Sequence, residues 1–103
     1  FPEPVGCESC GSLYRPGVVW FGESLDKRSL QDSWRAAERC DLFLSVGTAA
    51  SVQPAASLME VAKEAGAYVV ELNPNGTYAS AGVDLIINEP SEVFFPKLLK
   101  AFG

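Results

Sequence analysis

Short apolar runs alternate with amphipathic segments along this chain, a pattern that predicts strands separated by helices. Four runs predict strands, and each is bounded by glycine, proline or polar residues. These runs are residues 18–21, 41–46, 68–72 and 83–87. The first is expected to be a strand or an extended segment. Because the runs are apolar on both faces, they are typical of parallel strands.

Three segments between and after these runs have helical spacing. The first spans about residues 29–39, with Ser29 and Asp32 as a cap-like pair at its start. Pro54 is expected in the first turn of the second helix, and Gly66 is expected to end that helix in a left-handed conformation. A third helix closes the chain, and Pro96 obscures where it begins. The apolar positions that define the helices are Leu30, Trp34, Ala37, Leu58, Val61, Ala62, Ala65, Leu98, Leu99 and Phe102.

The alternation of strand and helix predicts an α/β fold with a parallel sheet that helices cover on both sides. This is the arrangement of half a Rossmann-like fold, which we expect over residues 16–103. Residues 1–15 carry two cysteines and are expected to form a separate appendage. The length of 103 residues suffices for one small domain with a single core.

Composition narrows the class of protein further. With 48% hydrophobic and 20% charged residues, the chain has the composition of an ordinary globular protein. No apolar stretch approaches the roughly 20 residues that a membrane span needs, so no membrane partner is expected. The opening residues 1–4 contain no methionine and no signal-like pattern, which predicts a cut made inside a longer chain. In the absence of a targeting signal, a cytoplasmic location is expected.

The net charge of −5 argues against a nucleic-acid partner. Sequence-independent binding of nucleic acid requires clustered lysine and arginine to displace phosphate counterions, and the basic residues here are scattered. An acidic surface suits lysine-rich protein substrates, but a modest negative charge is also the usual means of keeping a protein soluble.

Cys7 and Cys10 have the spacing of two thiolates presented to zinc from a tight turn, and Gly11 suits such a turn. The pair supplies two of the four ligands that a structural zinc normally has. A redox function of the pair, or a coincidence of spacing, stays open; a redox pair is expected at a junction of strand and helix. Cys40 follows a helical pattern and is expected to be a small buried apolar residue.

Two loops follow predicted strands at the edge where parallel sheets bind ligands. Residues 47–51 are small, so a ribose or phosphate can approach the backbone there, and Asn73 ends the next strand. Both loops also fit ordinary tight turns with a purely structural function. The Gly-x-Gly-x-x-Gly pattern is missing, so the sequence does not support a standard dehydrogenase.

Four segments taken together resemble the C-terminal half of a sirtuin, a family of NAD-dependent protein-lysine deacylases. These segments are the cysteine pair, residues 15–23 (Arg-Pro-Gly-Val-Val-Trp-Phe-Gly-Glu), residues 46–51 (Val-Gly-Thr-Ala-Ala-Ser) and residues 71–73 (Glu-Leu-Asn). The resemblance implies the C-terminal part of a zinc-ribbon module at 1–15 and the C-terminal half of a Rossmann-like NAD-binding domain at 16–103. It also implies two partners: an acyl-lysine protein or peptide, and the N-terminal half of the enzyme.

The resemblance implies that residues 19–23 bind the acylated peptide as an added strand. The Val19 carbonyl would accept a hydrogen bond from the acyl-lysine Nε–H, and Phe21 would line the acyl-lysine tunnel. Gly22 and Glu23 would shape the peptide groove beside Trp20. By residue type alone, Trp20 and Phe21 are equally core aromatics of an edge strand.

For the cofactor, the resemblance implies NAD contacts on the adenosine side. The implied residues are Gly47, Thr48, Ala49 and Val52, with Asn73 at the ribose and Ser91 and Glu92 at the adenine edge. Ala49 replaces the serine usual in the family. The family's catalytic base is a histidine, and this chain has none, so no catalytic residue is assigned and the chain alone is expected to be inactive. Glu23 and Glu71 are expected to be cap, groove or surface residues. The alternative is a non-catalytic NAD or ADP-ribose binding module.

Overall fold

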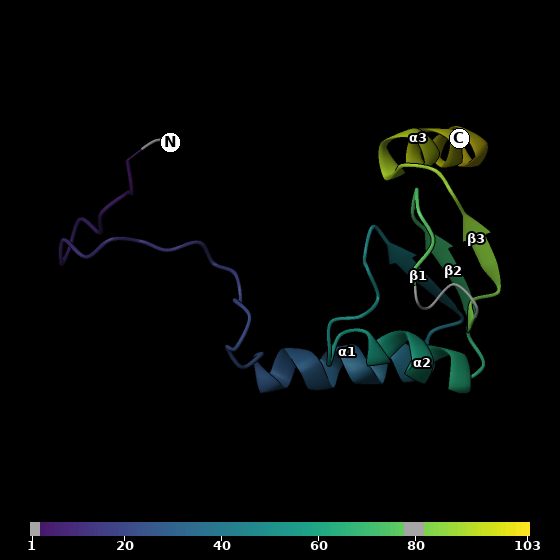
Figure 1. Cartoon of the computed structure of the whole chain (residues 1–103), viewed down its shortest axis with the longest axis horizontal. Helices are drawn as coiled ribbons and strands as arrows, with labels where there is room; N and C mark the ends of the chain where they lie inside the picture. The colour runs from purple at the N-terminus through teal and green to yellow at the C-terminus, as the bar shows by residue number, and fades with distance from the viewer. Residues whose placement is uncertain (1–2, 78–81) are drawn as a thin grey trace.

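A computed structural model describes residues 3–77 and 82–103 and contains the expected parallel sheet. The elements in chain order are α1 (Lys27–Arg39), β1 (Leu42–Val46), α2 (Ser57–Glu64), β2 (Tyr68–Leu72), β3 (Leu85–Ile87) and α3 (Ser91–Phe102) (Figure 1). The three strands are parallel in the order β1-β2-β3. The predicted α/β class is confirmed, and β1 and β2 lie where the apolar pattern placed them.

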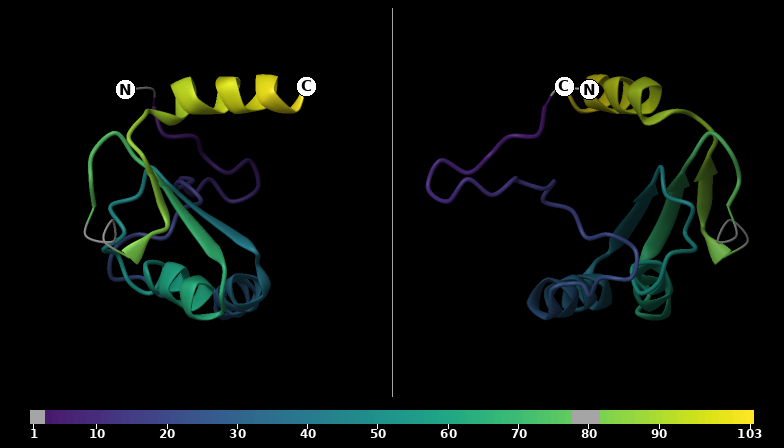
Figure 2. Two further views of the ribbon diagram at one scale, coloured as in Figure 1. Left: turned by 90° about the vertical axis from the view of Figure 1, so that its right-hand side faces the viewer. Right: turned by 60° about the vertical axis from the view of Figure 1, so that its left-hand side comes forward.

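Residues 3–26 extend away from the α/β body as an arm that ends at α1 (Figure 2). Within the arm, Gly6 and Leu13 form an antiparallel bridge, and Tyr14 N donates to the Val5 carbonyl at 2.8 Å. Residues 5–14 are therefore a small hairpin whose turn holds both cysteines of the pair.

The core lies between the two helices that precede and follow β1. Ala37 of α1, Ala62 of α2 and Ala67 before β2 are 4%, 0% and 6% exposed. Because their side chains are small, the helices and the sheet approach closely at this point. The partly buried residues that surround this cluster are Cys40, Phe43, Leu58 and Val61. Cys40, which was expected to be a small buried apolar residue, packs against this cluster but is only partly buried.

On the opposite face of the sheet, Val70 and Leu72 of the central strand β2 are buried, while several apolar side chains around them are exposed. Side chains alternate along a strand, so Phe43 faces the helices while Leu42 and Leu44 face away from them. Leu42, Leu44, Tyr68 and Leu85 are between 44% and 54% exposed on that second face. The third helix, α3, lies beyond the carboxyl ends of the strands (Figure 1). The predicted parallel sheet flanked by helices is confirmed, with α1 and α2 packed together on one face.

The start of α1 differs from the prediction because a different residue caps it. Asp26 accepts hydrogen bonds from Ser29 N at 2.8 Å and from Ser29 Oγ at 2.7 Å, and α1 begins at Lys27. These hydrogen bonds also hold the pKa of Asp26 below its usual value. A carboxylate that accepts from the third residue of a helix is a strong N-cap, so the helix begins two residues before Ser29.

Two further boundaries lie later in the chain than predicted. Residues 53–56 form turns, including the bond from Ser57 N to the Pro54 carbonyl, so Pro54 precedes α2. β3 begins only at Leu85, because Asp84 binds β2 with its side chain: Val69 N donates to Asp84 Oδ2 at 2.8 Å. Gly66 has φ of +97° after α2, as predicted for a left-handed helix stop.

Residues 18–21 are not part of a strand. They form an extended segment and a turn, closed by the bond from Glu23 N to the Trp20 carbonyl at 3.0 Å. The apolar side chains of Val18, Val19 and Trp20 are about half exposed, so they are not core residues. No helix within residues 3–77 and 82–103 is both long and apolar enough to cross a membrane.

Candidate functional site

Two loops meet at the carboxyl ends of β1 and β2. The first loop is residues 47–51, after β1, and the second is residues 73–77, after β2. Asn73 Nδ2 donates to the Thr48 carbonyl at 3.1 Å, and Gly47 N donates to the Leu72 carbonyl at 3.0 Å. The backbone N–H of Asn73 is bound to the Ile87 carbonyl at 3.0 Å, which anchors the second loop to β3. The structure thus brings Thr48 and Asn73 together, as their positions after neighbouring parallel strands predicted.

The first loop is held in a tight conformation by its own groups. Gly47 has φ of +63°, which glycine adopts without a steric penalty, and Ala50 has φ of +53°. Thr48 Oγ1 accepts from Ala50 N at 3.1 Å. Because the hydroxyl acts as an acceptor there, its hydrogen stays available to a ligand. Ala49 contributes a methyl group where the resemblance leads one to expect a hydroxyl.

The second loop is fastened to β2 by a buried carboxylate. Glu71 is 1% exposed, and Thr77 Oγ1 donates to Glu71 Oε2 at 2.7 Å. Within the loop, Asn73 Oδ1 accepts from Asn75 N at 3.1 Å. The expectation of a cap, groove or surface position for Glu71 is wrong, because this side chain lies inside the fold and supports the loop.

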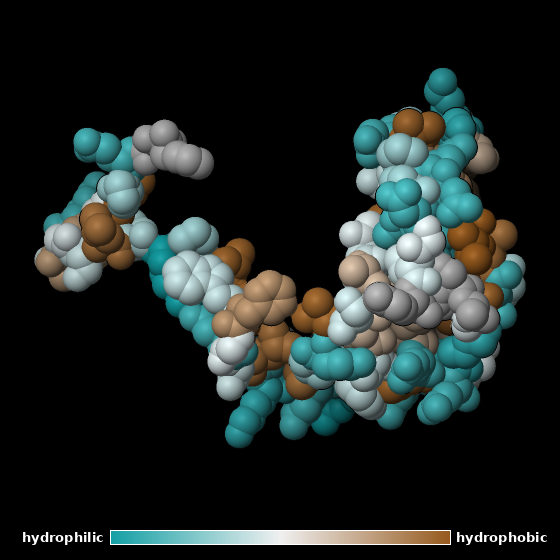
Figure 3. Space-filling view, viewed as in Figure 1, coloured by the Kyte–Doolittle hydropathy of each residue, from teal (hydrophilic) through white to brown (hydrophobic). Residues whose placement is uncertain are grey.

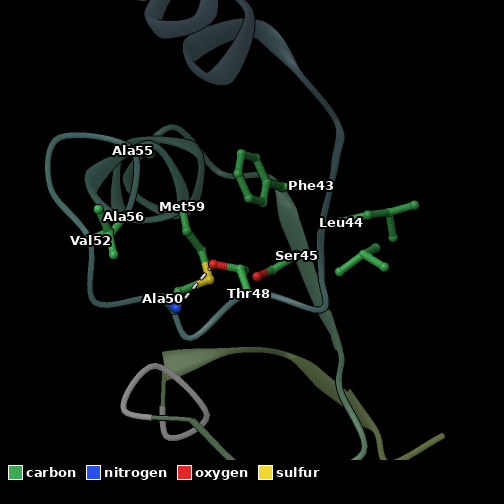
Figure 4. A pocket seen from close by; sticks show the side chains of 10 residues that line it. Phe43, Leu44, Ser45, Thr48, Ala50, Val52, Ala55, Ala56 and Met59 are labelled. Atoms are coloured by element: carbon green, nitrogen blue, oxygen red, sulfur yellow. Dashed lines mark hydrogen bonds between the residues drawn. The ribbon is translucent and has the colours of Figure 1, made fainter. Parts of the chain in front are cut away.

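A hollow of about 220 Å³ opens beside the first loop. In Figure 4 the side chains of Ser45 from β1, Thr48 from the loop and Met59 from α2 converge on it. Its wall combines hydroxyl groups with apolar surface, which suits a ligand that has both sugar-like and flat apolar parts. The lining residues are Phe43, Leu44, Ser45, Val46, Thr48, Ala50, Val52, Ala55, Ala56 and Met59.

A second hollow, of about 400 Å³, lies between the arm and the body, where Figure 3 shows the surface indented and apolar atoms gathered. Residues 19–25 form one wall, and residues 52–55 form the other, with Leu30. All five predicted substrate residues therefore lie in one groove. Val52 and Ala55 line both hollows, so the hollow beside Thr48 adjoins the groove of residues 19–25.

Glu23 is not free to act as a base in this groove. Its carboxylate forms an ion pair with Arg15, with Nη1 at 2.7 Å from Oε1. The pKa of Glu23 is lowered from its usual value, first by the Arg15 guanidinium and then by the Trp20 backbone N–H. A carboxylate with a lowered pKa is a weaker proton acceptor near neutral pH. The sequence analysis did not include Arg15 among the site residues. The signal in the sequence was a pair of opposite charges, Arg15 and Glu23, on either side of an apolar segment.

Ser91 and Glu92 begin α3, after a short connection from β3. They lie beyond the same edge of the sheet as the two loops, because all three strands run parallel and end there. Within the described ranges, no hydrogen bond or ion pair joins Ser91 or Glu92 to residues 47–50 or 73–76. Their assignment to the adenine edge stays a prediction.

The hairpin of residues 5–14 holds Cys7 and Cys10, the two predicted zinc ligands. Gly11 N donates to the Cys7 carbonyl at 2.8 Å, with Gly11 at φ of +73°. The pKa of Cys7 is lowered from 9.0 to about 7, first by the backbone N–H of Cys10, then by that of Ser9 and by the Tyr14 hydroxyl. These donors favour a thiolate, the form that binds zinc. No group of three or more metal-binding side chains occurs within residues 3–77 and 82–103, so zinc binding by the cysteine pair stays a prediction.

Comparison with known proteins places these features in a family. Residues 2–54 match the model of the Sir2 family. The chain is 50% identical over 100 residues to NAD-dependent protein deacylase 1 of Caldanaerobacter subterraneus subsp. tengcongensis, covering 97% of this chain and 41% of that protein. It is 44% identical over 98 residues to NAD-dependent protein deacylase 1 of Pseudomonas aeruginosa, covering 95% and 39%.

Solved structures of Sir2 proteins have the same fold. A complex of a Sir2 homologue with NAD superposes with a TM-score of 0.83 at 39% identity, covering 97% of this chain and 39% of the other. A Sir2 complex with a p53 peptide and NAD⁺ has a TM-score of 0.83 at 28% identity, covering 97% and 42%. The chain spans about two fifths of the length of these relatives.

Proposed function

This chain belongs to the Sir2 family, and from that premise we propose that it forms part of an NAD-dependent protein-lysine deacylase. In this proposal it supplies the adenosine side of the NAD site and one wall of the acyl-peptide cleft. The observation that carries the proposal is the meeting of Thr48 and Asn73 at the carboxyl edge of the sheet. Parallel sheets of this type bind nucleotides at that edge.

For the nucleotide, the proposed contacts come from both loops and from α3. Thr48 retains a hydroxyl hydrogen, and Asn73 Nδ2 has a second hydrogen beyond the one given to the Thr48 carbonyl. Both can be donated to ribose oxygens. The proposed set is Gly47, Thr48, Ala49, Val52 and Asn73, with Ser91 and Glu92 at the adenine edge. NAD dependence in the relatives' names and the NAD complex among the similar structures support this assignment.

For the substrate, we place an extended acyl-lysine peptide in the hollow lined by residues 19–25 and 52–55. Among the described residues, none donates a hydrogen bond to the Val19 carbonyl, so it can accept one from the acyl-lysine Nε–H. Phe21 is 92% exposed, which places an apolar ring where an acyl chain can contact it. Pairing through the peptide backbone would make recognition tolerant of sequence. The similar structures with a p53 peptide and a propionylated peptide support this reading.

The chemistry requires a group from outside this chain. When bound, NAD supplies the ribose carbon that accepts the acyl oxygen. The proton acceptor in this family is a histidine, and the chain contains none. The residues present here therefore bind and orient the two substrates, and proton transfer belongs to the part of the enzyme that this chain does not span.

A chimera tests the proposed function. Residues 1–103 replace the matching segment of the Caldanaerobacter subterraneus deacylase, which supplies the remaining three fifths of the protein. We expect the folded chimera to release nicotinamide from NAD only when an acetyl-lysine peptide is present. A chimera that binds ADP-ribose without deacylating would favour the alternative, a non-catalytic NAD or ADP-ribose binding module. A folded chimera that does neither would overturn both.

Substitution of Asn73 by alanine is expected to weaken ADP-ribose binding in the chimera. The change removes the amide that joins the two loops and one donor to the ribose. Loss of a hydrogen bond partner from a covered site costs about 1–3 kcal/mol, a roughly 5- to 150-fold rise in Kd. Calorimetric titration measures the change. Asn75→Ala is the matched control, because among the described residues Asn75 contacts the loop through its backbone N–H and not through its side chain. Equal effects of both substitutions would contradict the assignment.

We also propose that Cys7 and Cys10 supply two of four thiolate ligands to a structural zinc. The 103-residue chain alone is then expected to hold zinc weakly, or to share it between two copies, because two thiolates leave half of the tetrahedron open. Competition against a chromophoric chelator measures the affinity, and Cys40→Ala is the control. Tight binding of one zinc per verified monomer would contradict this expectation.

A further inference from the structure

Arg15 and Glu23 close the loop that carries the proposed substrate residues. Two bonds join the side chains: Arg15 Nη1 to Glu23 Oε1 at 2.7 Å, and Nη2 to Oε2 at 3.2 Å. The same Nη2 donates to the Val18 carbonyl at 3.0 Å. A paired contact of guanidinium and carboxylate fixes direction as well as distance. We call this ion pair, with its bonds to Val18 and Trp20, the Arg15–Glu23 clamp.

The clamp contacts Trp20 at three groups: its backbone N–H, its carbonyl and its indole ring. Its backbone N–H donates to Glu23 Oε2 at 3.1 Å, and its carbonyl accepts from Glu23 N at 3.0 Å. The Arg15 guanidinium carbon lies 4.1 Å from the centre of the indole ring, within the range of a cation–π contact. Arg15 therefore binds both the carboxylate and the ring, and both oxygens of Glu23 are engaged inside the loop.

Burial does not hold this loop in place. Val18, Val19 and Trp20 are 51–55% exposed, and Phe21 is 92% exposed. A surface loop with so few apolar contacts has many accessible conformations unless specific bonds restrict them. The clamp supplies such bonds at both ends of residues 18–22, while the backbone between them, including the Val19 carbonyl, stays open to a partner.

We propose that Arg15 and Glu23 are positioning residues that hold the loop of residues 18–22 in the conformation that accepts an acylated peptide. This inference rests on the proposed function, because the groove of residues 19–25 and 52–55 is taken as the peptide site. It changes the role expected for Glu23: its carboxylate binds residues of the loop itself and not the peptide. Preorganisation of this kind lowers the ordering cost of binding.

Nuclear magnetic resonance of the 103-residue chain tests the clamp directly. Arg15→Lys keeps the charge but loses the planar guanidinium, and Glu23→Ala removes the acceptor. Both variants are expected to shift the Trp20 indole signal and the amide signals of residues 18–22, and to leave those of residues 68–72 in place. Exposed ion pairs add little to overall stability, so thermal unfolding should be unchanged.

Lys97→Ala is the matched control, because it removes another exposed ion pair, Lys97 with Glu89, far from the loop in sequence. It should leave the signals of residues 18–22 where they are. Glu23→Gln keeps an acceptor for Trp20 N and should shift the loop signals less than Glu23→Ala. Loop signals that do not respond to Arg15→Lys or Glu23→Ala would overturn the clamp.

The chimera tests the consequence for substrate. Glu23→Ala is expected to raise KM for the acetyl-lysine peptide by about tenfold or more, since misplacement of a binding segment is costly, with ADP-ribose affinity unchanged. An unchanged peptide KM beside shifted loop signals would overturn the positioning role and leave the proposed deacylase function intact. An inactive unsubstituted chimera would instead count against the proposed function, while the loop signals still decide whether the clamp exists.

Discussion

Incubated with NAD and an acetyl-lysine peptide, the 103-residue chain alone is expected to release no nicotinamide above a protein-free blank. The reaction needs a proton acceptor that titrates near neutral pH, and the chain has no histidine. The carboxylates near the two hollows do not replace it. Glu23 is bound to Arg15 with a lowered pKa, and Glu71 is buried and accepts a hydrogen bond from Thr77.

The measurement is nicotinamide release followed by chromatography, with the active chimera as the positive control. General acid–base catalysis contributes roughly 10²–10⁴-fold on its own, so the loss should bring the signal to the blank. Nicotinamide release by the pure chain that depends on the acylated peptide would refute this expectation. It would also show that a group other than histidine acts as the proton acceptor.

Ala37→Asp is expected to cost about 3–5 kcal/mol of stability, the usual effect of an unpaired charge in a core. Ala37 is 4% exposed and lies in the contact between α1, α2 and the segment before β2. A small domain has only about 5–15 kcal/mol of net stability, so the variant should be largely unfolded or close to unfolding. Urea denaturation followed by circular dichroism measures the change.

Ala36→Asp is the matched control, since Ala36 is the neighbouring residue on α1 and is exposed. The same substitution there should cost no more than about 0.7 kcal/mol, the difference in helix propensity. Similar losses for both variants would mean that the cluster of Ala37, Ala62 and Ala67 does not form the core of the chain in solution.

The repeating pattern of apolar residues determined most of the secondary structure. Helical spacing and strand-like runs are local properties, and they placed α1, β1, α2 and β2 near their observed positions. The left-handed stop at Gly66 was equally local, because it depends on one residue without a side chain. The order of these elements was enough to predict a parallel sheet with Thr48 and Asn73 at the same edge.

Element boundaries depended on competition between side chains that the pattern does not resolve. Asp26, and not Ser29, caps the N-terminus of α1. The side chain of Asp84, the residue before β3, accepts a hydrogen bond from Val69 N. Each outcome follows from which acceptor reaches a given N–H in three dimensions. The apolar segment 18–21 resembles a strand locally, yet no neighbouring strand pairs with it in the described structure.

By itself, then, the sequence determined the element types, the parallel α/β class and the small residues at the carboxyl edge of the sheet, because these follow from the nature of single residues and their spacing. Only the tertiary structure decided which side chains meet. It paired Arg15 with Glu23, buried Glu71 against Thr77 and packed α1 and α2 together on one face of the sheet. Such contacts join residues that are not neighbours in the sequence. The distances between their side chains depend on how the whole backbone is packed.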